Sequence, residues 1–522
     1  MDIDPLDPAE LQVLNSRLTG IAEEMGAVLR RAAFSPNIKE RADCSAAVFT
    51  PKGELLVQAE HIPVHLGSMP ASVAAAVASG VVPRPGDQIV LNDPFAGGTH
   101  INDITLVAPC FVEGELIGWT ANRAHHADLG GMAPGSIPPD AVEIYQEGLR
   151  IPPVLLSPQV IALLTANSRT PEERGGDLDA QIGANVVGVE RLGSFVGTPF
   201  DEITAYGERR MRAAIRELAN GEWVVEDVID SVGPRPQQRA GARIRLRLTV
   251  DADELTFDFN GTDLQQPGTV NAVEAVTVSA VAFSVRSVVD PTIPANGGAL
   301  RPVHVIAPPG TVVAARPPAA VGAGNVEVSQ RVADVCLHAL AAAAPGRVAA
   351  AGQGTMNNLI VGGRSGWVYY ETIGGGQGGR QGRRGMNGVH TNMTNTADTP
   401  TEALERTYPM RVLRYRLRQG SGGAGRAAGG EGIERVLQVL EPATLSLITE
   451  RRKSRPWGLA GGEPGSVGEN WLWPGGKEAD RRPLLDKVTV ELAAGDAVQI
   501  LTPGGGGYGE AGETVDQRGR LS

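Results

Sequence analysis

The chain has 522 residues, with 47 basic and 59 acidic side chains and a formal net charge of -12. At roughly 100–200 residues per domain, this length suggests about two to four domains and a large buried core. The acidic balance, without a basic stripe, argues against nucleic acid as the main partner. No apolar run approaches the roughly 18–20 residues that span a bilayer, and the N-terminus lacks the order of a signal peptide, so we expect a cytoplasmic protein without a membrane partner.

The glycine and cysteine counts set further expectations. Glycine occurs 67 times and aromatic residues make up only 4%, which predicts many turns, close backbone approaches and an aliphatic core. The three cysteines, Cys44, Cys110 and Cys336, supply neither a disulfide framework nor a four-cysteine zinc site. Cys44 and Cys110 are expected to be small core residues rather than nucleophiles.

The N-terminal part of the chain alternates helix and strand patterns. Asp7 and Glu10 have the spacing of a helix cap, and apolar residues at spacings of three and four predict one helix that ends near Ser35. A second, alanine-rich helix is expected from Ser68 to about Ser79. Strands are predicted at 46–49 and 55–57, joined as a hairpin by a Pro/Gly turn, and at 88–91, 104–111 and 116–122.

The remainder of the chain changes character along its length. Helical patterns at 160–220 and 328–344 flank a strand at 240–250, and from about residue 350 glycine clusters separate short strand candidates. The predicted fold class is α/β, with mixed sheets and packed helices in the N-terminal part and a β-rich, glycine-rich C-terminal third. We predict an N-terminal α/β region with the metal site, a central α/β region and the glycine-rich region, at 1–205, 206–350 and 351–522.

Five of the eight histidines fall close together and beside carboxylates, at His61, His65, His100, His125 and His126. Imidazole and carboxylate groups in one region suit a divalent ion of the Zn, Mn or Fe type. The alternative is that they line a polar crevice without binding an ion. Pro63 disfavours a helix between His61 and His65, so these two are expected to line the pocket rather than bind the ion.

The sequence does not contain a complete nucleotide-binding motif. The chain contains no GxxxxGK[ST] sequence. Residues 374–379 fit GxGxxG, but an arginine-rich segment follows where a phosphate site needs a helix N-terminus. This segment predicts a structural glycine turn, or an arginine loop at a protein interface, and no ATP site within this chain alone.

Ten segments, spread over about residues 6–510, resemble the hydantoinase B/oxoprolinase family. They are HIPVHLGSMP (61–70), NDPFAGGTHINDITLVAP (92–109), ANRAHHADLGG (121–131), EIYQEGLRIPP (143–153), GGDLDAQIGAN (175–185), GNVEVSQRVAD (324–334), GQGTMNN (352–358), GVHTNMTNTADTPTEALERTYPMRV (388–412), TERRKSRPWGLAGGEPG (449–465) and TPGGGGYG (502–509).

The resemblance implies a two-subunit reaction. Family members include the B subunit of ATP-dependent N-methylhydantoinase, the C-terminal half of 5-oxoprolinase, caprolactamase, and subunits of acetone and acetophenone carboxylases. It implies that a separate hydantoinase A-type partner binds ATP and phosphorylates the substrate, while this chain completes the reaction at one divalent metal ion (Mn, Zn or Fe). The metal ligands implied by the matching motifs are Asp43, His100, Asp103 and His125.

From this resemblance we expect the B subunit of an ATP-dependent cyclic amidohydrolase that works as a hetero-oligomer on a small cyclic amide. A metal-bound water would attack the activated carbonyl carbon. Asp103 or His126 would take its proton, or His126 would instead orient a ligand by a hydrogen bond. Two alternatives stay open: a subunit of an ATP-dependent ketone carboxylase, and a non-catalytic assembly subunit.

Overall fold

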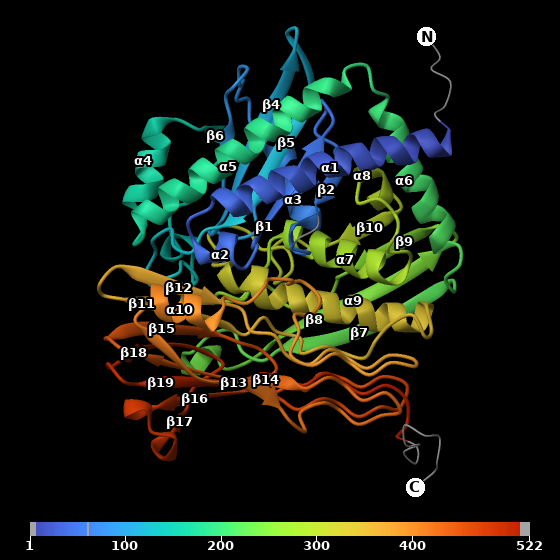
Figure 1. The fold of residues 1–522 in the computed structure, drawn as a ribbon. Helices are drawn as coiled ribbons and strands as arrows, with labels where there is room; N and C mark the ends of the chain where they lie inside the picture. The colour runs from blue at the N-terminus through green and yellow to red at the C-terminus, as the bar shows by residue number, and fades with distance from the viewer. Residues whose placement is uncertain (1–6, 60–61, 512–522) are drawn as a thin grey trace.

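A computed structural model of the chain describes residues 7–59 and 62–511 (Figure 1). Helix α1 (Pro8–Ala32) begins at the predicted cap, where the Asp7 carboxylate accepts the N–H groups of Ala9 and Glu10 at 2.7 and 2.8 Å. The Glu10 carboxylate in turn accepts the Asp7 N–H at 3.1 Å, which completes a capping box. No helix within the described residues is long and apolar enough to cross a membrane.

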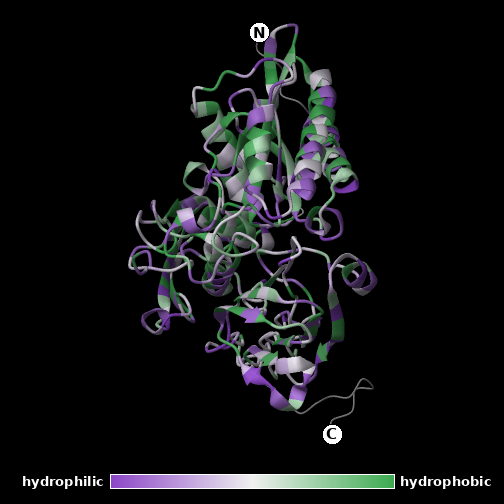
Figure 2. Ribbon diagram, turned by 90° about the vertical axis from the view of Figure 1, so that its left-hand side faces the viewer, coloured by the Kyte–Doolittle hydropathy of each residue, from purple (hydrophilic) through white to green (hydrophobic). Residues whose placement is uncertain are grey.

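The N-terminal part is a six-stranded antiparallel sheet between helices, with strand order β2-β1-β5-β4-β3-β6. Alternate residues of β1 face opposite ways: Ala46 and Val48 join the core under α1 and α5, whereas Ala47 and Phe49 join the core under α3. The long helices that flank the sheet mix hydrophobic and hydrophilic residues along their length (Figure 2). The elements are β1 (Cys44–Phe49), β2 (Leu55–Ala59), β3 (Ile89–Leu91), β4 (Asp103–Val112), β5 (Glu115–His125), β6 (Val154–Leu155), α2 (Pro36–Lys39), α3 (His65–Ala78), α4 (Pro158–Ala166) and α5 (Pro171–Leu192).

Helix α3 begins at His65, three residues before the predicted start at Ser68. The reason is tertiary: the N–H groups of Gly67 and Ser68 donate to the Ser279 hydroxyl of α7 (Glu274–Val288) at 2.9 and 3.0 Å. A Cβ at Gly67 would lie 2.7 Å from the Ser279 backbone nitrogen, so glycine permits this close helix contact. The earlier start places His65 in the first turn of the helix, with Pro63 just outside it.

The central part is a four-stranded sheet, in the order β10-β9-β8-β7, covered by α9. Helix α9 also packs on α7, which contacts α3, so the central part continues from the first sheet without a gap (Figure 1). The boundary predicted at 205/206 falls inside α6, and the three-region division stays a prediction. The elements are α6 (Phe200–Ile215), β7 (Gly221–Ile229), β8 (Ala242–Asp251), β9 (Glu254–Asp258), α8 (Gly297–Leu300), β10 (Val303–Ile306), a π-helical turn (Gly324–Val328) and α9 (Ser329–Ala343).

The C-terminal third is β-rich, as predicted. Two sheets, in the orders β12-β11-β15-β18 and β13-β14-β19-β16-β17, share a core of aliphatic and tyrosine side chains. The elements are β11 (Asn358–Gly363), β12 (Trp367–Glu371), α10 (Thr401–Thr407), β13 (Met410–Arg418), β14 (Gly432–Val439), β15 (Ala443–Ile448), β16 (Glu469–Trp473), β17 (Arg482–Pro483), β18 (Lys487–Leu492) and β19 (Ala497–Leu501).

Glycine-rich segments of this third run side by side as extended chains, at the lower right of Figure 1. A Cβ at Gly378 would lie 1.7 Å from the Ala350 carbonyl oxygen. The Gly505 N–H donates to the Gly430 carbonyl at 3.0 Å, so backbone packs directly on backbone. Within the described residues no helix follows 374–379, so the segment lacks the helix N-terminus of a dinucleotide site; its role as a structural turn or an interface loop stays a prediction.

Candidate metal centre

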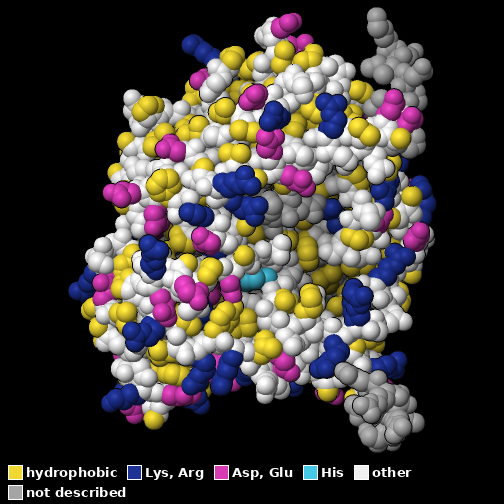
Figure 3. Space-filling view, in the orientation of Figure 1, with side chains coloured by type: hydrophobic (Ala, Val, Ile, Leu, Met, Phe, Trp, Pro, Cys, Tyr) yellow, Lys and Arg dark blue, Asp and Glu magenta, His cyan; other side chains and the backbone are white. Residues whose placement is uncertain are grey.

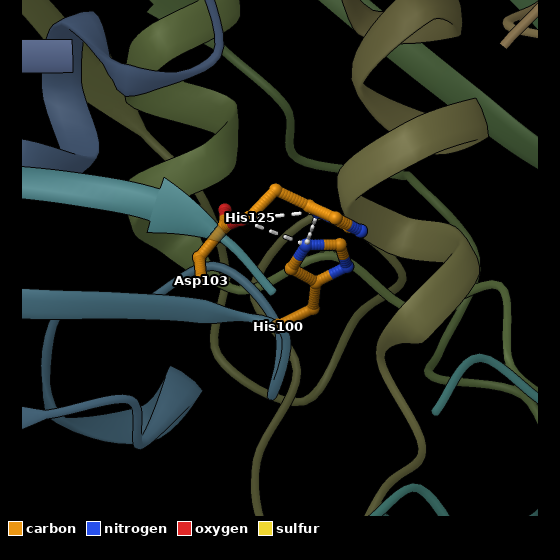
Figure 4. A group of neighbouring side chains, drawn as sticks. All are labelled: His100, Asp103 and His125. Atoms are coloured by element: carbon orange, nitrogen blue, oxygen red, sulfur yellow. Dashed lines mark hydrogen bonds and ion pairs between the residues drawn. The ribbon is translucent and has the colours of Figure 1, made fainter. Parts of the chain in front are cut away.

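Neighbouring strand ends bring the predicted residues together. Strand β4 begins at Asp103 and strand β5 ends at His125, and these two residues are directly opposite each other in the antiparallel pair. His100 lies in the turn just before β4, and Asp43 precedes β1, whose first residue pairs with the residue before His125. The loops at the strand ends therefore meet at one edge of the sheet, as Figure 4 shows for three of these side chains.

Three side-chain atoms form a nearly equilateral triangle. His100 Nε2 lies 3.1 Å from Asp103 Oδ1 and 3.2 Å from His125 Nδ1, and His125 Nδ1 lies 3.3 Å from Asp103 Oδ1. Ligand bonds of about 2.1 Å place neighbouring ligand atoms about 3.0 Å apart in an octahedron and about 3.4 Å apart in a tetrahedron. The triangle therefore has the dimensions of one face of a metal coordination shell.

The protonation chemistry of the triangle also suits a cation. All three side chains are buried, with exposed fractions of 0 to 3%. Two ring nitrogens face one another, and the buried Asp103 Oδ1 between them accepts no hydrogen bond of good geometry. A bound ion accepts the lone pairs of both ring nitrogens and of the carboxylate oxygen at the same time. Two ring N–H groups that point into the same space would instead repel each other. The residues present thus fit a divalent ion with nitrogen and oxygen ligands.

Asp103 is held as a carboxylate. Burial acts to raise its pKa, but the neighbouring imidazoles of His100, His125 and His65 outweigh burial and hold that pKa well below its usual range. The Thr99 hydroxyl donates to Oδ2, the oxygen outside the triangle. His65 Nε2 lies 3.5 Å from the same oxygen, and the other nitrogen of this ring is 2.8 Å from the Ser45 hydroxyl.

Asp43 lies in the wall of the same site. Its backbone carbonyl accepts the His125 N–H at 3.0 Å, and its side chain lines a small cavity together with Asp103 and His125. Its carboxylate is not part of the described group whose ligand atoms all lie within 4.8 Å of one another, which comprises His100, Asp103 and His125.

The small cavity measures about 20 Å³, enough for one water-sized species. His65 lines it, and Tyr370 of β12 closes it with a ring stacked on His125 at a centroid distance of 4.7 Å. Because these walls are buried, the site admits little solvent, and charges inside it interact more strongly than in water.

A second cavity of about 510 Å³ adjoins the first, and Thr394 lines both. Its wall combines apolar side chains such as Leu66 and Trp457 with the cationic Arg347 and Arg380. The face shown in Figure 3 is hollowed near its middle, in the region of α7, which contributes to this wall. The volume is ample for a small ring compound.

His126 lies away from the triangle. Its Nε2 is 2.9 Å from the Gln181 Oε1 of α5, so the ring is placed against that helix. Burial, with the Arg174 charge adding to it, lowers the pKa of His126 to about 4. Residue His61 lies outside the described residues, so its predicted position is not compared.

Sequence reasoning missed three residues at the site. Tyr370 and Asn325 line the small cavity. Arg41 donates a hydrogen bond to the hydroxyl of Thr372, another lining residue, at 2.6 Å. Asn325 belongs to the GNVEVSQ segment, whose match to the family was a signal that this stretch matters. Nothing in the sequence around Tyr370, an apolar strand, marked it.

The sequence profile of the hydantoinase B/oxoprolinase family matches residues 7–511. This chain belongs to the hydantoinase B/oxoprolinase family. It is 39% identical to 5-oxoprolinase 1 of Arabidopsis thaliana, over 96% of this chain and 42% of that protein. It is 32% identical to a Pseudomonas sp. (strain NS671) protein assigned as the B-type subunit of a D-/L-hydantoinase, over 97% of this chain and 91% of that protein.

The fold also agrees with that of a solved structure. The crystal structure of ATP-dependent caprolactamase from Pseudomonas jessenii superposes with a TM-score of 0.88 and 30% identity, over 97% of this chain and 92% of that one. Against the 5-oxoprolinase, by contrast, the chain spans about two fifths of the relative's length.

Proposed function

We propose that this chain is the metal-dependent B-type subunit of an ATP-dependent cyclic amidohydrolase. The observation that carries the proposal is the triangle of His100 Nε2, Asp103 Oδ1 and His125 Nδ1, with sides of 3.1 to 3.3 Å, in a buried cavity. The family, the likeness to a caprolactamase and the relative assigned as part of a hydantoinase support a cyclic amide as the substrate class.

The proposed ligands are His100, Asp103 and His125, with Asp43 as the fourth from the cavity wall. A divalent ion of the Zn, Mn or Fe type supplies, when bound, a water of lowered pKa and a Lewis acid for the carbonyl oxygen. The protein's own part is to hold these ligands. Thr99 and His65 fix Asp103 through its outer oxygen, and Tyr370 fixes the His125 ring by stacking.

The larger cavity is the proposed place of the ring. An amide carbonyl is a poor electrophile, and phosphorylation of its oxygen creates a good leaving group and an anionic substrate. Arg347 and Arg380 in the wall suit that negative charge, and Thr394 stands where the larger cavity meets the small one. The apolar wall, including Leu66 and Trp457, suits the methylene groups of a ring.

The phosphorylation itself is assigned to a partner. The glycine-rich segment 374–379 packs on other backbone segments and is not followed by a helix, which supports a phosphate site on another chain. We therefore propose a heteromer in which ATP is held by an A-type partner chain. The His126 ring is hydrogen-bonded to Gln181 of α5, so in this proposal it positions the strand end that carries His125 instead of taking a proton or bonding a ligand directly.

The test is turnover by the complex with an A-type partner, using hydantoin, 5-oxoproline and caprolactam with ATP. His100→Ala and His125→Ala are expected to lower the rate of ring opening more than about 100-fold. Removing a residue that hydrogen-bonds a metal ligand already costs up to about 100-fold in activity, and removing the ligand itself costs at least as much. His304→Ala is the matched control, since that histidine is exposed on β10 and pairs with Glu254.

Two outcomes contradict the proposal. ATP turnover that requires bicarbonate and a ketone identifies the carboxylase alternative instead. Full ring opening by the complex with His100→Ala identifies an assembly subunit without chemistry of its own.

A further inference from the structure

A π-helical turn, Gly324–Val328, immediately precedes α9 and delivers one residue to the metal centre. Such turns widen a helix locally and occur often at functional sites. A Cβ at Gly324 would lie 1.9 Å from the Asn271 carbonyl oxygen, so glycine lets the turn approach the preceding segment. The Ser329 hydroxyl donates to the Asn325 carbonyl at 2.6 Å and holds the turn from its other end.

The residue delivered is Asn325. Its side-chain Nδ2 lies 3.1 Å from His100 Nε2, the same separation as between His100 Nε2 and Asp103 Oδ1. The side chain is 4% exposed and lines the small cavity with Asp43 and His125. Its Oδ1 is buried and has no hydrogen-bond partner.

The amide oxygen of Asn325 is the unsatisfied atom of this side chain. A buried amide oxygen without a partner costs about 1–3 kcal/mol. Oxygen and nitrogen of an asparagine amide exchange places by a half-turn of the group, and the two have nearly the same shape. The half-turn brings Oδ1 to about 3.1 Å from His100 Nε2, which is the spacing of two neighbouring ligand atoms around one ion.

We infer that Asn325 supplies its amide oxygen as a further ligand to the ion held by His100, Asp103 and His125. The inference rests on the proposed function, because it needs an ion at the triangle. An amide oxygen adds a coordination position without adding charge, beside the carboxylates of Asp103 and Asp43. It also ties α9, which belongs to the central part of the fold, to a site built by the first sheet.

Cobalt(II) chloride is the probe, since its visible spectrum reports ligand number and geometry. The full chain is titrated with cobalt(II) against a chelator, for wild type, Asn325→Ala, Asn325→Leu and Asn325→Asp. We expect Ala and Leu to weaken cobalt binding about 10- to 100-fold and to change the intensity of the visible bands. Asn325→Asp keeps an oxygen at the position and is expected to bind cobalt at least as tightly as wild type.

Asn185→Ala is the matched control. This asparagine is also fully buried and hydrogen-bonded, to Gln88, but it lies between α5 and the sheet, away from the triangle. It is expected to lower thermal stability without moving the cobalt spectrum. Asn325→Leu keeps the branched arrangement of side-chain heavy atoms and removes both polar atoms, so it provides the answer if the alanine variant does not fold.

The outcomes separate this inference from the proposed function. Unchanged affinity and spectrum in the folded Leu variant overturn the assignment of Asn325 and leave the three-residue centre intact. A wild-type chain that binds no cobalt(II), manganese(II) or zinc(II) overturns both.

Discussion

Glu147 gives the protein a pH-dependent stability that one substitution removes. Its side chain is fully buried, and its Oε1 accepts the N–H groups of Val321 and Gly322 at 2.9 and 2.8 Å. Burial raises the pKa of Glu147 to about 8, and those hydrogen bonds only partly oppose it. The carboxyl group is therefore protonated in the folded chain at neutral pH.

The sign follows from the direction of that shift. A folded-state pKa above the unfolded value of about 4.5 means that folding takes up a proton between the two. The stabilising contribution is complete below pH 4.5 and is lost as the pH rises through about 8. At about 1.4 kcal/mol per pH unit, the free energy of unfolding falls by up to about 5 kcal/mol over this window.

Glu147→Gln mimics the protonated acid and keeps an oxygen for the two N–H groups. The assay is thermal unfolding of both proteins at pH 5, 6, 7 and 8. We expect nearly equal midpoints at pH 5 and a variant more stable by up to about 4 °C at pH 8, from an unfolding entropy of about 2 cal/mol/K per residue. Other buried acids such as Glu327 titrate in both proteins and cancel. A constant difference from pH 5 to pH 8 refutes the reasoning.

Three further predictions test packing and reactivity. The Arg123 guanidinium is fully buried and donates to hydroxyls on α3 and β4. Arg123→Met leaves these buried acceptors without their donor and is expected to lower the free energy of unfolding by about 1–3 kcal/mol, measured by urea denaturation; no loss of stability contradicts this. Gly378→Ala, which drives a Cβ against the Ala350 carbonyl, is expected to abolish soluble expression, whereas Gly183→Ala on α5, with open space around it, is expected to raise the melting temperature slightly. The thiol of Cys44, whose pKa burial raises to about 12, is expected to escape iodoacetamide at pH 8 in the folded protein and to react in urea; rapid labelling of the native chain contradicts its burial.

Local signals predicted the elements that local forces decide. The Asp7–Glu10 spacing located the start of α1, and the Pro/Gly turn located the first hairpin, because caps and turns depend on a few neighbouring residues. The burial of Cys44 and Cys110 also confirms their expected place in the core. The predicted start of α3 was wrong by three residues, because a hydroxyl group of α7 accepts the N–H groups of its first turn and no local pattern reports that contact.

The same distinction holds at the metal centre. Asp103 and His125 lie at the ends of adjacent strands and His100 lies in the turn just before one of them, so the concentration of such residues in the sequence pointed to them. Asn325 and Tyr370 reach the site from parts of the chain about 200 or more residues away, through tertiary packing that no local pattern reports. The His126 side chain points toward α5 because that helix covers its side of the sheet, which the sequence around His126 does not report.

The most direct test of the central claim is the metal content of the purified chain by elemental analysis, with wild type beside His100→Ala, His125→Ala and the control His304→Ala. The proposed centre predicts about one equivalent of Mn, Zn or Fe in wild type and in the control, and its loss in both ligand variants. A wild-type chain that stays metal-free after incubation with each ion contradicts the account, and so does a metal content that the two ligand substitutions leave unchanged.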